Sequence, residues 1–301
     1  MSPPESSAST TNVHGKAQAL RSLLCSPDLA FAMEAHDGLS ARIVERAGFP
    51  IIWASGLSIS TALGVRDSNE ASWSQVIAVL EFMSDATSIP ILVDGDSGHG
   101  NFNNVRRFVK QLCQRGLAGV CFEDKLYPKM NSFVGEQQPL AEIAEFCGRI
   151  KAGKDSQDNP AFCIVARVEA LISGHGMGEA LRRAEAYREA GADAILIHSK
   201  KSVPDEILTF AAQWENRCPL VVVPTKYYRT PTQIFRDARI SLVIWGNHNM
   251  RAAAAAMLRI SQRIRTDEGV ERIESDIATL ESIFTMFDYD ELFEAEQKYL
   301  P

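Results

Sequence analysis

The sequence predicts a single (β/α)8 barrel of the TIM type, in which eight parallel strands alternate with helices. Eight short apolar runs recur along the chain, and amphipathic segments that end on glycine lie between them. Nearly continuous apolar runs are typical of parallel strands buried on both faces. Eight such units in about 250 residues match the size of this α/β fold. A doubly wound open sheet is the alternative that the same pattern allows.

The predicted strands are described by their sequences, in chain order. They are "LAFAMEA" (29–35), "PIIWASG" (50–56), "IPILVDGD" (89–96), "LAGVCFED" (117–124), "FCIVARVEA" (162–170), "ADAILIHS" (192–199), "PLVVVPT" (219–225) and "ISLVIWGN" (240–247). Each contains the β-branched or apolar residues of a buried strand.

The helices between these strands are marked by apolar periodicity and by their ends. The segment "NNVRRFVKQLCQRG" (103–116) begins on an Asn cap, and "MGEALRRAEAYREAG" (177–191) ends, like the first, on glycine. These are ordinary helix start and stop signals. Two further helical segments, 269–287 and 289–300, are extra to a minimal barrel and suit packing against another subunit.

Composition excludes several classes of protein. The chain has 301 residues and a net charge of -7, and it has no long Lys/Arg run, which argues against a nucleic-acid binder. No apolar stretch reaches the roughly 18 residues of a membrane span. Six cysteines are scattered without a CxxC pair, which favours buried thiols and the cytoplasm.

We expect residues 1–15 to form a flexible tail and residues 16–301 to form one barrel domain with its C-terminal helices. The tail is polar and rich in Ser, Thr and Pro, and it lacks the apolar core of a signal peptide. No linker or short-period repeat interrupts the remainder.

Polar residues gather where the predicted strands end, which is the end of a barrel that carries chemistry. Asp94 and Asp96 lie two residues apart at one strand end, and Glu123 ends the neighbouring strand. Three converging carboxylates suit Mg²⁺, a hard cation that retains several waters. The alternative is that "DGDSGHGN" is a glycine-rich turn in which the Asp residues form turns and caps. Glu123 favours the metal.

Two later strands end in Arg167 and His198. An arginine suits bidentate contact with a carboxylate or phosphate, but Arg167 could equally pair with Glu169 or Glu123 at the barrel mouth. A lone histidine such as His198 is more commonly a core residue with its hydrogen bonds satisfied.

The second strand ends in a further group of candidates. Backbone N–H groups of Ser55, Gly56 and Leu57 could bind an anion, although a plain strand-to-loop turn explains them equally well. Trp53 alone indicates packing. Asp67 lies in "LGVRDSNEASW", where "DSNE" fits a helix start capped by Asp67 or Ser68.

Five segments together carry a resemblance to a known family. In chain order, "DGDSGHGNFNNVRR", "EDKLYPKMNS", "VARVEA", "ILIHSKK" and "VPTKYY" resemble the phosphoenolpyruvate mutase family, which shares a superfamily with isocitrate lyase. The resemblance runs from about residue 16 to the C-terminus, and its most specific part is EDK, five residues, then NS. It implies a (β/α)8 barrel, Mg²⁺ dependence, and homo-oligomers, dimers or usually tetramers, that swap the eighth barrel helix.

The resemblance also implies a reaction and a role for each matching residue. The family interconverts phosphoenolpyruvate and phosphonopyruvate, the entry step of phosphonate biosynthesis. Asp67 would take or steer the phosphoryl group, and a mobile loop would close over the substrate. By this resemblance the metal residues are Asp94, Asp96 and Glu123, partly through water; the catalytic residues are Asp67, Lys129, Asn131, Ser132 and His198; the substrate-binding residues are Trp53, Ser55, Gly56, Leu57 and Arg167.

The loop separates this activity from those of relatives. Carbon–carbon lyases of the superfamily carry a loop cysteine, whereas this chain has Lys129-Met130-Asn131-Ser132. Phosphonopyruvate hydrolase lacks the loop asparagine, so Asn131 favours the mutase. A barrel that only binds a phosphorylated acid is the non-enzymatic alternative. "DGDSGHG" replaces the family's commoner "DADTGYG" but keeps both acids. Asp124 and Lys125 have no implied role, and we expect them to form salt bridges at the barrel mouth.

Overall fold

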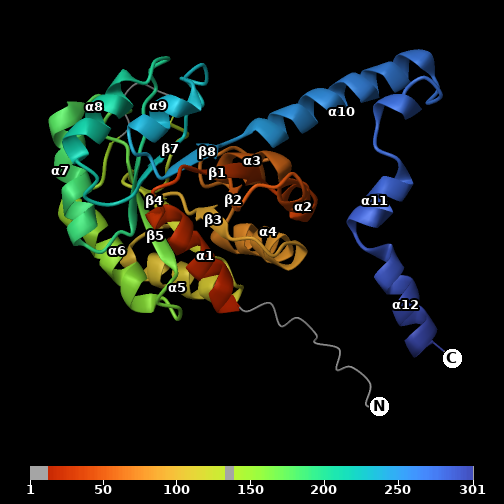
Figure 1. Ribbon diagram of the computed structural model, residues 1–301, viewed down its shortest axis with the longest axis horizontal. Helices are drawn as coiled ribbons and strands as arrows, with labels where there is room; N and C mark the ends of the chain where they lie inside the picture. The colour runs from red at the N-terminus through yellow and green to blue at the C-terminus, as the bar shows by residue number, and fades with distance from the viewer. Residues whose placement is uncertain (1–12, 133–138, 301) are drawn as a thin grey trace. The chain divides into compact units, whose positions relative to one another are not determined.

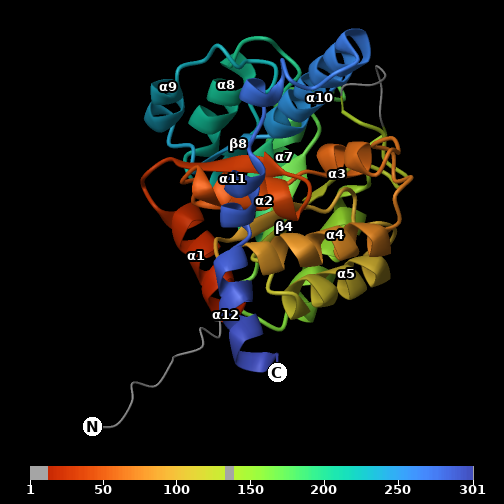
Figure 2. The same cartoon turned by 90° about the vertical axis from the view of Figure 1, so that its right-hand side faces the viewer.

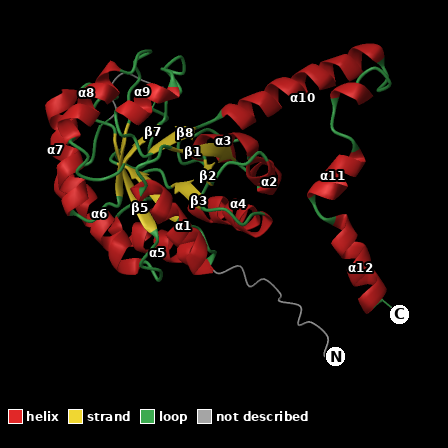
Figure 3. Ribbon diagram, in the orientation of Figure 1, coloured by secondary structure: helices red, strands yellow, loops and turns green. Residues whose placement is uncertain are grey.

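The computed structural model describes residues 13–132 and 139–300. Within them, eight parallel strands form a closed barrel in sequential order, surrounded by helices (Figures 1 and 3). The strands are β1 (Ala30–Ala35), β2 (Ile51–Ala54), β3 (Ile91–Asp94), β4 (Gly119–Glu123), β5 (Cys163–Val168), β6 (Ala194–Ile197), β7 (Leu220–Val222) and β8 (Leu242–Trp245). The predicted fold is therefore confirmed, and the open-sheet alternative is wrong because β1 pairs with β8.

The barrel has apolar side chains on both faces of its strands, which explains the continuous apolar runs. Along β2, Ile51 and Trp53 belong to the core inside the barrel, whereas Ile52 and Ala54 belong to the larger core beneath the helices. Leu20, from the first helix, α1 (Val13–Cys25), packs into the inner core as well. Interior side chains fill the barrel, so a ligand has room only at its ends.

Nine helices of the described chain belong to this barrel unit. They are α1 (Val13–Cys25), α2 (Gly38–Arg46), α3 (Gly56–Ala62), α4 (Trp73–Ala86), α5 (Phe102–Gln114), α6 (Ile143–Ser156), α7 (Gly176–Glu189), α8 (Asp205–Trp214) and α9 (Thr232–Asp237). Figure 2 shows α4 and α5 side by side on the outside of the barrel. Residues 1–12 of the predicted tail lie outside the described residues.

Two predicted helix starts are corrected by the observed caps. The cap of α5 is Asn101, two residues before the predicted Asn103. No helix starts at "DSNE": α4 begins after Ser72, whose hydroxyl accepts from Gln75 N while the Gln75 side chain binds the Ser72 backbone. This reciprocal capping box satisfies two backbone donors at once. Asp67 and Ser68 are therefore not caps, and Asp67 is available to the barrel mouth.

Contacts divide the chain into two compact units, Met1–Met250 and Arg251–Pro301. The second contains most of α10 (His248–Asp267), a 3-10 turn (Glu274–Asp276), α11 (Leu280–Met286) and α12 (Tyr289–Tyr299). The prediction of one helix over 269–287 is wrong, because Ile277 is extended and Thr279 caps a new helix. None of the helices in the described residues is long and apolar enough to cross a membrane.

Candidate functional site

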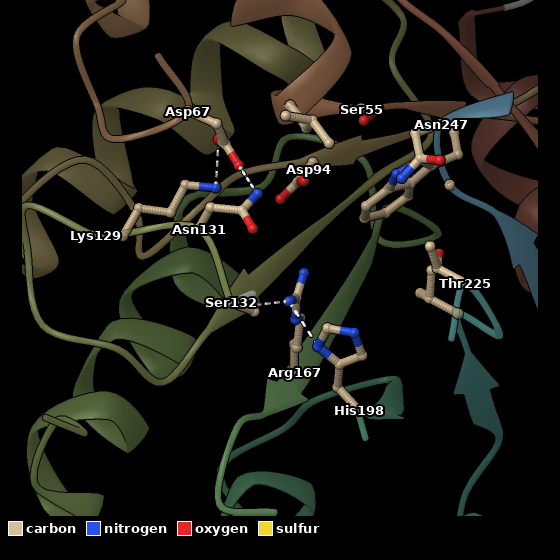
Figure 4. Close-up of a pocket in the computed structure, with 14 residues that line it drawn as sticks. Ser55, Asp67, Asp94, Lys129, Asn131, Ser132, Arg167, His198, Thr225 and Asn247 are labelled. Carbon is tan, nitrogen blue, oxygen red and sulfur yellow. Dashed lines mark hydrogen bonds and ion pairs between the residues drawn. The ribbon is translucent and has the colours of Figure 1, made fainter. Parts of the chain in front are cut away.

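A polar pocket opens where the barrel strands end, with an empty volume of about 520 Å³ (Figure 4). It is lined by Trp53, Ser55, Leu57, Asp67, Asp94, Lys129, Asn131, Ser132, Arg167, His198, Val223, Thr225, Gly246 and Asn247. Every predicted site residue except Gly56, Asp96 and Glu123 is in this lining, and those three adjoin it.

The two aspartates of the predicted metal site lie against the start of α3. Gly56 N donates to Asp94 Oδ2 at 3.3 Å, and Asp96 N lies 3.4 Å from Asp94 Oδ1. A Cβ at Gly56 would lie 3.1 Å from an Asp96 carboxylate oxygen and 3.2 Å from an Asp94 one. A side chain at position 56 would therefore crowd the space between the acids and would require their carboxylates to shift.

Glu123 differs from the two aspartates because its carboxylate has no hydrogen-bond donor among the described residues. Both of its carboxylate oxygens are buried, and neither accepts a hydrogen bond from any described residue. The nearest cations are Arg167 Nε at 3.5 Å and Lys125 Nζ at 3.9 Å. Buried carboxylates normally have hydrogen-bond or metal partners. Both oxygens are therefore available to a ligand.

Burial raises the pKa of Asp94, Asp96 and Glu123 above its ordinary value. A divalent cation would favour the ionised forms and offset this cost. Among the residues described, however, no group of three or more His, Cys, Asp or Glu side chains is arranged to hold a metal ion directly. The acids therefore suit a cation such as Mg²⁺, which keeps much of its water shell, better than a metal ion held entirely by protein ligands.

Asp67 lies between the side chains of Lys129 and Asn131, which both belong to the segment "EDKLYPKMNS" (123–132). Lys129 Nζ is 2.8 Å from Asp67 Oδ1, and Asn131 Nδ2 donates to Asp67 Oδ2 at 2.6 Å (Figure 4). Burial alone would raise the pKa of Asp67, but Lys129 and then Asn131 lower it. Asp67 is thus an ionised carboxylate with both oxygens engaged.

Lys129 joins Asp67 to the acid cluster, since its ammonium also lies 2.6 Å from Asp96 Oδ1. Burial would lower the pKa of Lys129, but Asp96 and the other acids raise it well above its usual range. Asn69 supports this contact: it accepts from Lys129 N at 2.6 Å and donates to Asp96 Oδ2 at 2.7 Å. Sequence reasoning missed Asn69, although it lies within the "DSNE" segment that carries Asp67.

Arg167 and His198 form one buried network around Glu169. Arg167 Nε lies 2.6 Å from Glu169 Oε1, so the pairing predicted as an alternative is observed. His198 Nδ1 lies 2.8 Å from Arg167 Nη2 and 2.9 Å from Glu169 Oε1. Burial and the Arg167 charge lower the pKa of His198, so its ring is neutral. His198 is thus a hydrogen-bonded buried residue that also faces the pocket.

Comparisons with known proteins agree with this geometry. The phosphoenolpyruvate phosphomutase family model matches residues 20–265. A protein of Tetrahymena pyriformis with that name is 56% identical over 286 residues, 95% of each chain. The chain belongs to the phosphoenolpyruvate phosphomutase family. A solved phosphoenolpyruvate phosphomutase structure from Streptomyces platensis subsp. rosaceus is 41% identical, with a TM-score of 0.93 over 95% of this chain and 99% of that one.

A second enzyme of similar structure marks the alternative activity. Phosphonopyruvate hydrolase, solved in complex with oxalate and Mg²⁺, is 39% identical, with a TM-score of 0.90 over 95% of this chain and 99% of that one. The predicted family is confirmed, and the chain is more similar to the named phosphomutases than to this hydrolase.

The pocket of this phosphomutase family member includes residues that were not predicted as site residues. Val223 and Thr225 follow β7, and Gly246 precedes Asn247 after β8. Their signal was positional, since they lie in the last three residues of predicted strands. No unusual chemistry marks them in the sequence.

The salt bridges expected for Asp124 and Lys125 are both present. Asp124 Oδ2 lies 3.1 Å from Arg183 Nη1, and Lys125 Nζ lies 3.2 Å from Glu169 Oε2. The first joins the residue after β4 to α7, outside the pocket lining. The second lies directly beside the Arg167 network.

Proposed function

We propose that this chain is a Mg²⁺-dependent isomerase that interconverts phosphoenolpyruvate and phosphonopyruvate by moving the phosphoryl group between oxygen and carbon. The observation that carries the proposal is the ionised carboxylate of Asp67. It faces the pocket between Lys129 and Asn131, beside the buried acids at the ends of β3 and β4. No cysteine is among the described residues that line this pocket, so the acid chemistry of a carbon–carbon lyase loop has no candidate among them.

Phosphoryl transfer depends mainly on positioning and on neutralising charge, because its transition state is loose. Asp67 would take or steer the phosphoryl group as the P–O bond breaks and the P–C bond forms. Lys129 and Asn131 fix both of its oxygens. Arg167 and His198, oriented by Glu169, would bind the substrate carboxylate with the backbone of Ser55 and Leu57.

Asp94, Asp96 and Glu123 would hold Mg²⁺, partly through water. When bound, the metal would polarise the pyruvyl oxygens and stabilise the negative charge of the enolate. Asp94 accepts hydrogen bonds from Gly56 N and Asp96 N, and these orient its carboxylate.

The proposal is tested by phosphorus NMR of the purified protein with phosphonopyruvate and Mg²⁺. Formation of phosphoenolpyruvate is expected. Inorganic phosphate with pyruvate would instead show a hydrolase, and the absence of any reaction would favour a binding protein.

Replacing Asn131 with alanine is expected to lower turnover by about 10- to 100-fold and to release some phosphate with pyruvate. The variant loses the amide that holds Asp67 Oδ2 and leaves space for water beside the phosphoryl group. Product ratios by phosphorus NMR check this, with Asn103→Ala, an exposed position on α5, as control. Wild-type turnover with no phosphate would refute the role of Asn131.

We also propose that the chain forms a homo-oligomer in which α10 is exchanged between subunits. None of the helices α10, α11 and α12 buries a residue within the single chain. Large apolar side chains are exposed along them: Met257, Leu258, Leu280, Phe284, Leu292 and Phe293. Apolar surface of this extent marks an association site. Light scattering should give at least twice the 33.2 kDa chain mass, and a monomer would contradict the proposal.

The cytoplasm remains the proposed compartment. The cysteines in the described residues are all free thiols. Free thiols persist where the environment is reducing.

A further inference from the structure

Lys125 is a buried lysine to which the proposed mechanism gives no role, and all of its donors are used. Its ammonium lies 2.6 Å from Ser132 Oγ, 3.1 Å from the Met130 carbonyl oxygen and 3.2 Å from Glu169 Oε2. An ammonium has three N–H groups, so these contacts account for all of them. Two of the three go to the chain segment Lys129–Ser132, which borders the pocket.

Glu169 connects this lysine to the substrate side of the pocket. Its Oε2 accepts from Ser132 Oγ at 2.8 Å and pairs with Lys125, while its Oε1 pairs with Arg167 at 2.6 Å. Ser132 Oγ also accepts from Arg167 Nη2 at 2.8 Å. One carboxylate therefore links the segment that carries Asn131 to the arginine.

The backbone next to Lys125 is fixed to the barrel through its neighbour Asp124. Asp124 Oδ1 accepts from Glu169 N at 2.9 Å, and its Oδ2 accepts from Tyr187 Oη at 2.8 Å. Ala141 N donates to Asp124 O at 2.8 Å. Lys125 thus extends from a part of the barrel held by these hydrogen bonds towards the segment 129–132.

We propose that Lys125 is a positioning residue that holds the segment 129–132 against Glu169, so that Lys129 and Asn131 stay on Asp67 during phosphoryl transfer. The proposal rests on the proposed function for its catalytic consequence. The attachment of the segment can be measured without activity. Removing the ammonium should release the Met130 carbonyl and weaken the attachment of Ser132, displace Asn131 and admit water.

The catalytic test compares Lys125→Met with the wild type on phosphonopyruvate. Turnover should fall on the order of 10- to 100-fold, KM should change less than kcat, and the share of phosphate with pyruvate should rise. Lys110→Met, at an exposed position on α5, removes the same charge and should match the wild type. A kcat within twofold of the wild type with no phosphate would overturn the proposal.

Trypsin gives a second readout on the folded protein. The Lys129–Met130 bond should be cut selectively faster in Lys125→Met, while the rest of the barrel stays resistant. Equal resistance of that bond in variant and wild type, or cleavage spread evenly over the chain, would contradict the proposal. If the wild type makes no phosphoenolpyruvate, the proposed function fails, but this comparison still decides whether Lys125 holds the segment.

Ser132→Ala breaks the same attachment from the other side and leaves the Lys125–Glu169 pair intact. It should reproduce the faster cleavage, and the double variant should be no slower in turnover than Lys125→Met alone, because both remove one coupled contact. If the losses of turnover of the two single variants multiply in the double variant, Lys125 and Ser132 act independently and the proposal is overturned. If Lys125→Met does not fold, Ser132→Ala decides: unchanged cleavage after Lys129 would refute the attachment.

Discussion

Replacing Asp67 with alanine is expected to lower turnover on the order of 10³-fold or more while leaving Mg²⁺ binding intact. Losing one preorganised charge-stabilising group typically costs about 10²- to 10³-fold, and Asp67 also supports Lys129 and Asn131. The acids of the proposed metal site do not depend on it, since Lys129 retains Asp96 as a partner.

The measurement is kcat for phosphonopyruvate, with Mg²⁺ binding followed by calorimetry. Asp205→Ala, an exposed aspartate on α8, is the matched control and should behave as the wild type. Because Asp67 caps no helix, an effect on folding is not expected. Turnover within tenfold of the wild type would remove Asp67 from the phosphoryl path.

Replacing Glu123 with glutamine should weaken Mg²⁺ binding and lower turnover, each by about 10- to 100-fold. The variant keeps the shape of the side chain but loses a charge whose two oxygens have no hydrogen-bond donor among the described residues. A metal site held through one or two carboxylates and water is sensitive to each charge.

Mg²⁺ titrations by calorimetry and by activity check this prediction. Glu189→Gln, at an exposed position on α7, controls for the change of residue type. An unchanged Mg²⁺ affinity would show that the buried acids serve Lys129 and Arg167 instead of a metal.

The barrel could be predicted because both faces of each strand are buried. Each strand therefore consists of consecutive apolar residues, which are visible in the sequence. The exact helix starts could not be predicted from the sequence, because several short polar residues near each start can act as the cap. "DSNE" had the composition of a cap, yet Ser72 and Gln75 form the better reciprocal pair. Similarly, the periodicity of 269–287 did not show the extended residue Ile277 that interrupts it.

The position of the candidate site followed from topology, because strand ends of a barrel meet at one mouth. What could not be predicted was which polar side chains pair there. Lys125 reaches Ser132 and Glu169, whereas its neighbour Asp124 points to Arg183 and Tyr187. Adjacent residues face opposite sides of a strand, but their partners lie on other strands and helices, and only the folded chain brings these together.

The central claim is that the phosphoryl group passes between oxygen and carbon without meeting water. It is tested most directly by running the reaction with Mg²⁺ in ¹⁸O-water and following phosphorus by NMR. The three non-bridging oxygens on phosphorus of the phosphoenolpyruvate formed from phosphonopyruvate should carry no ¹⁸O, whereas the bridging oxygen comes from the ketone, which exchanges with water by itself. Inorganic phosphate containing ¹⁸O as the main product would contradict the claim and identify a hydrolase.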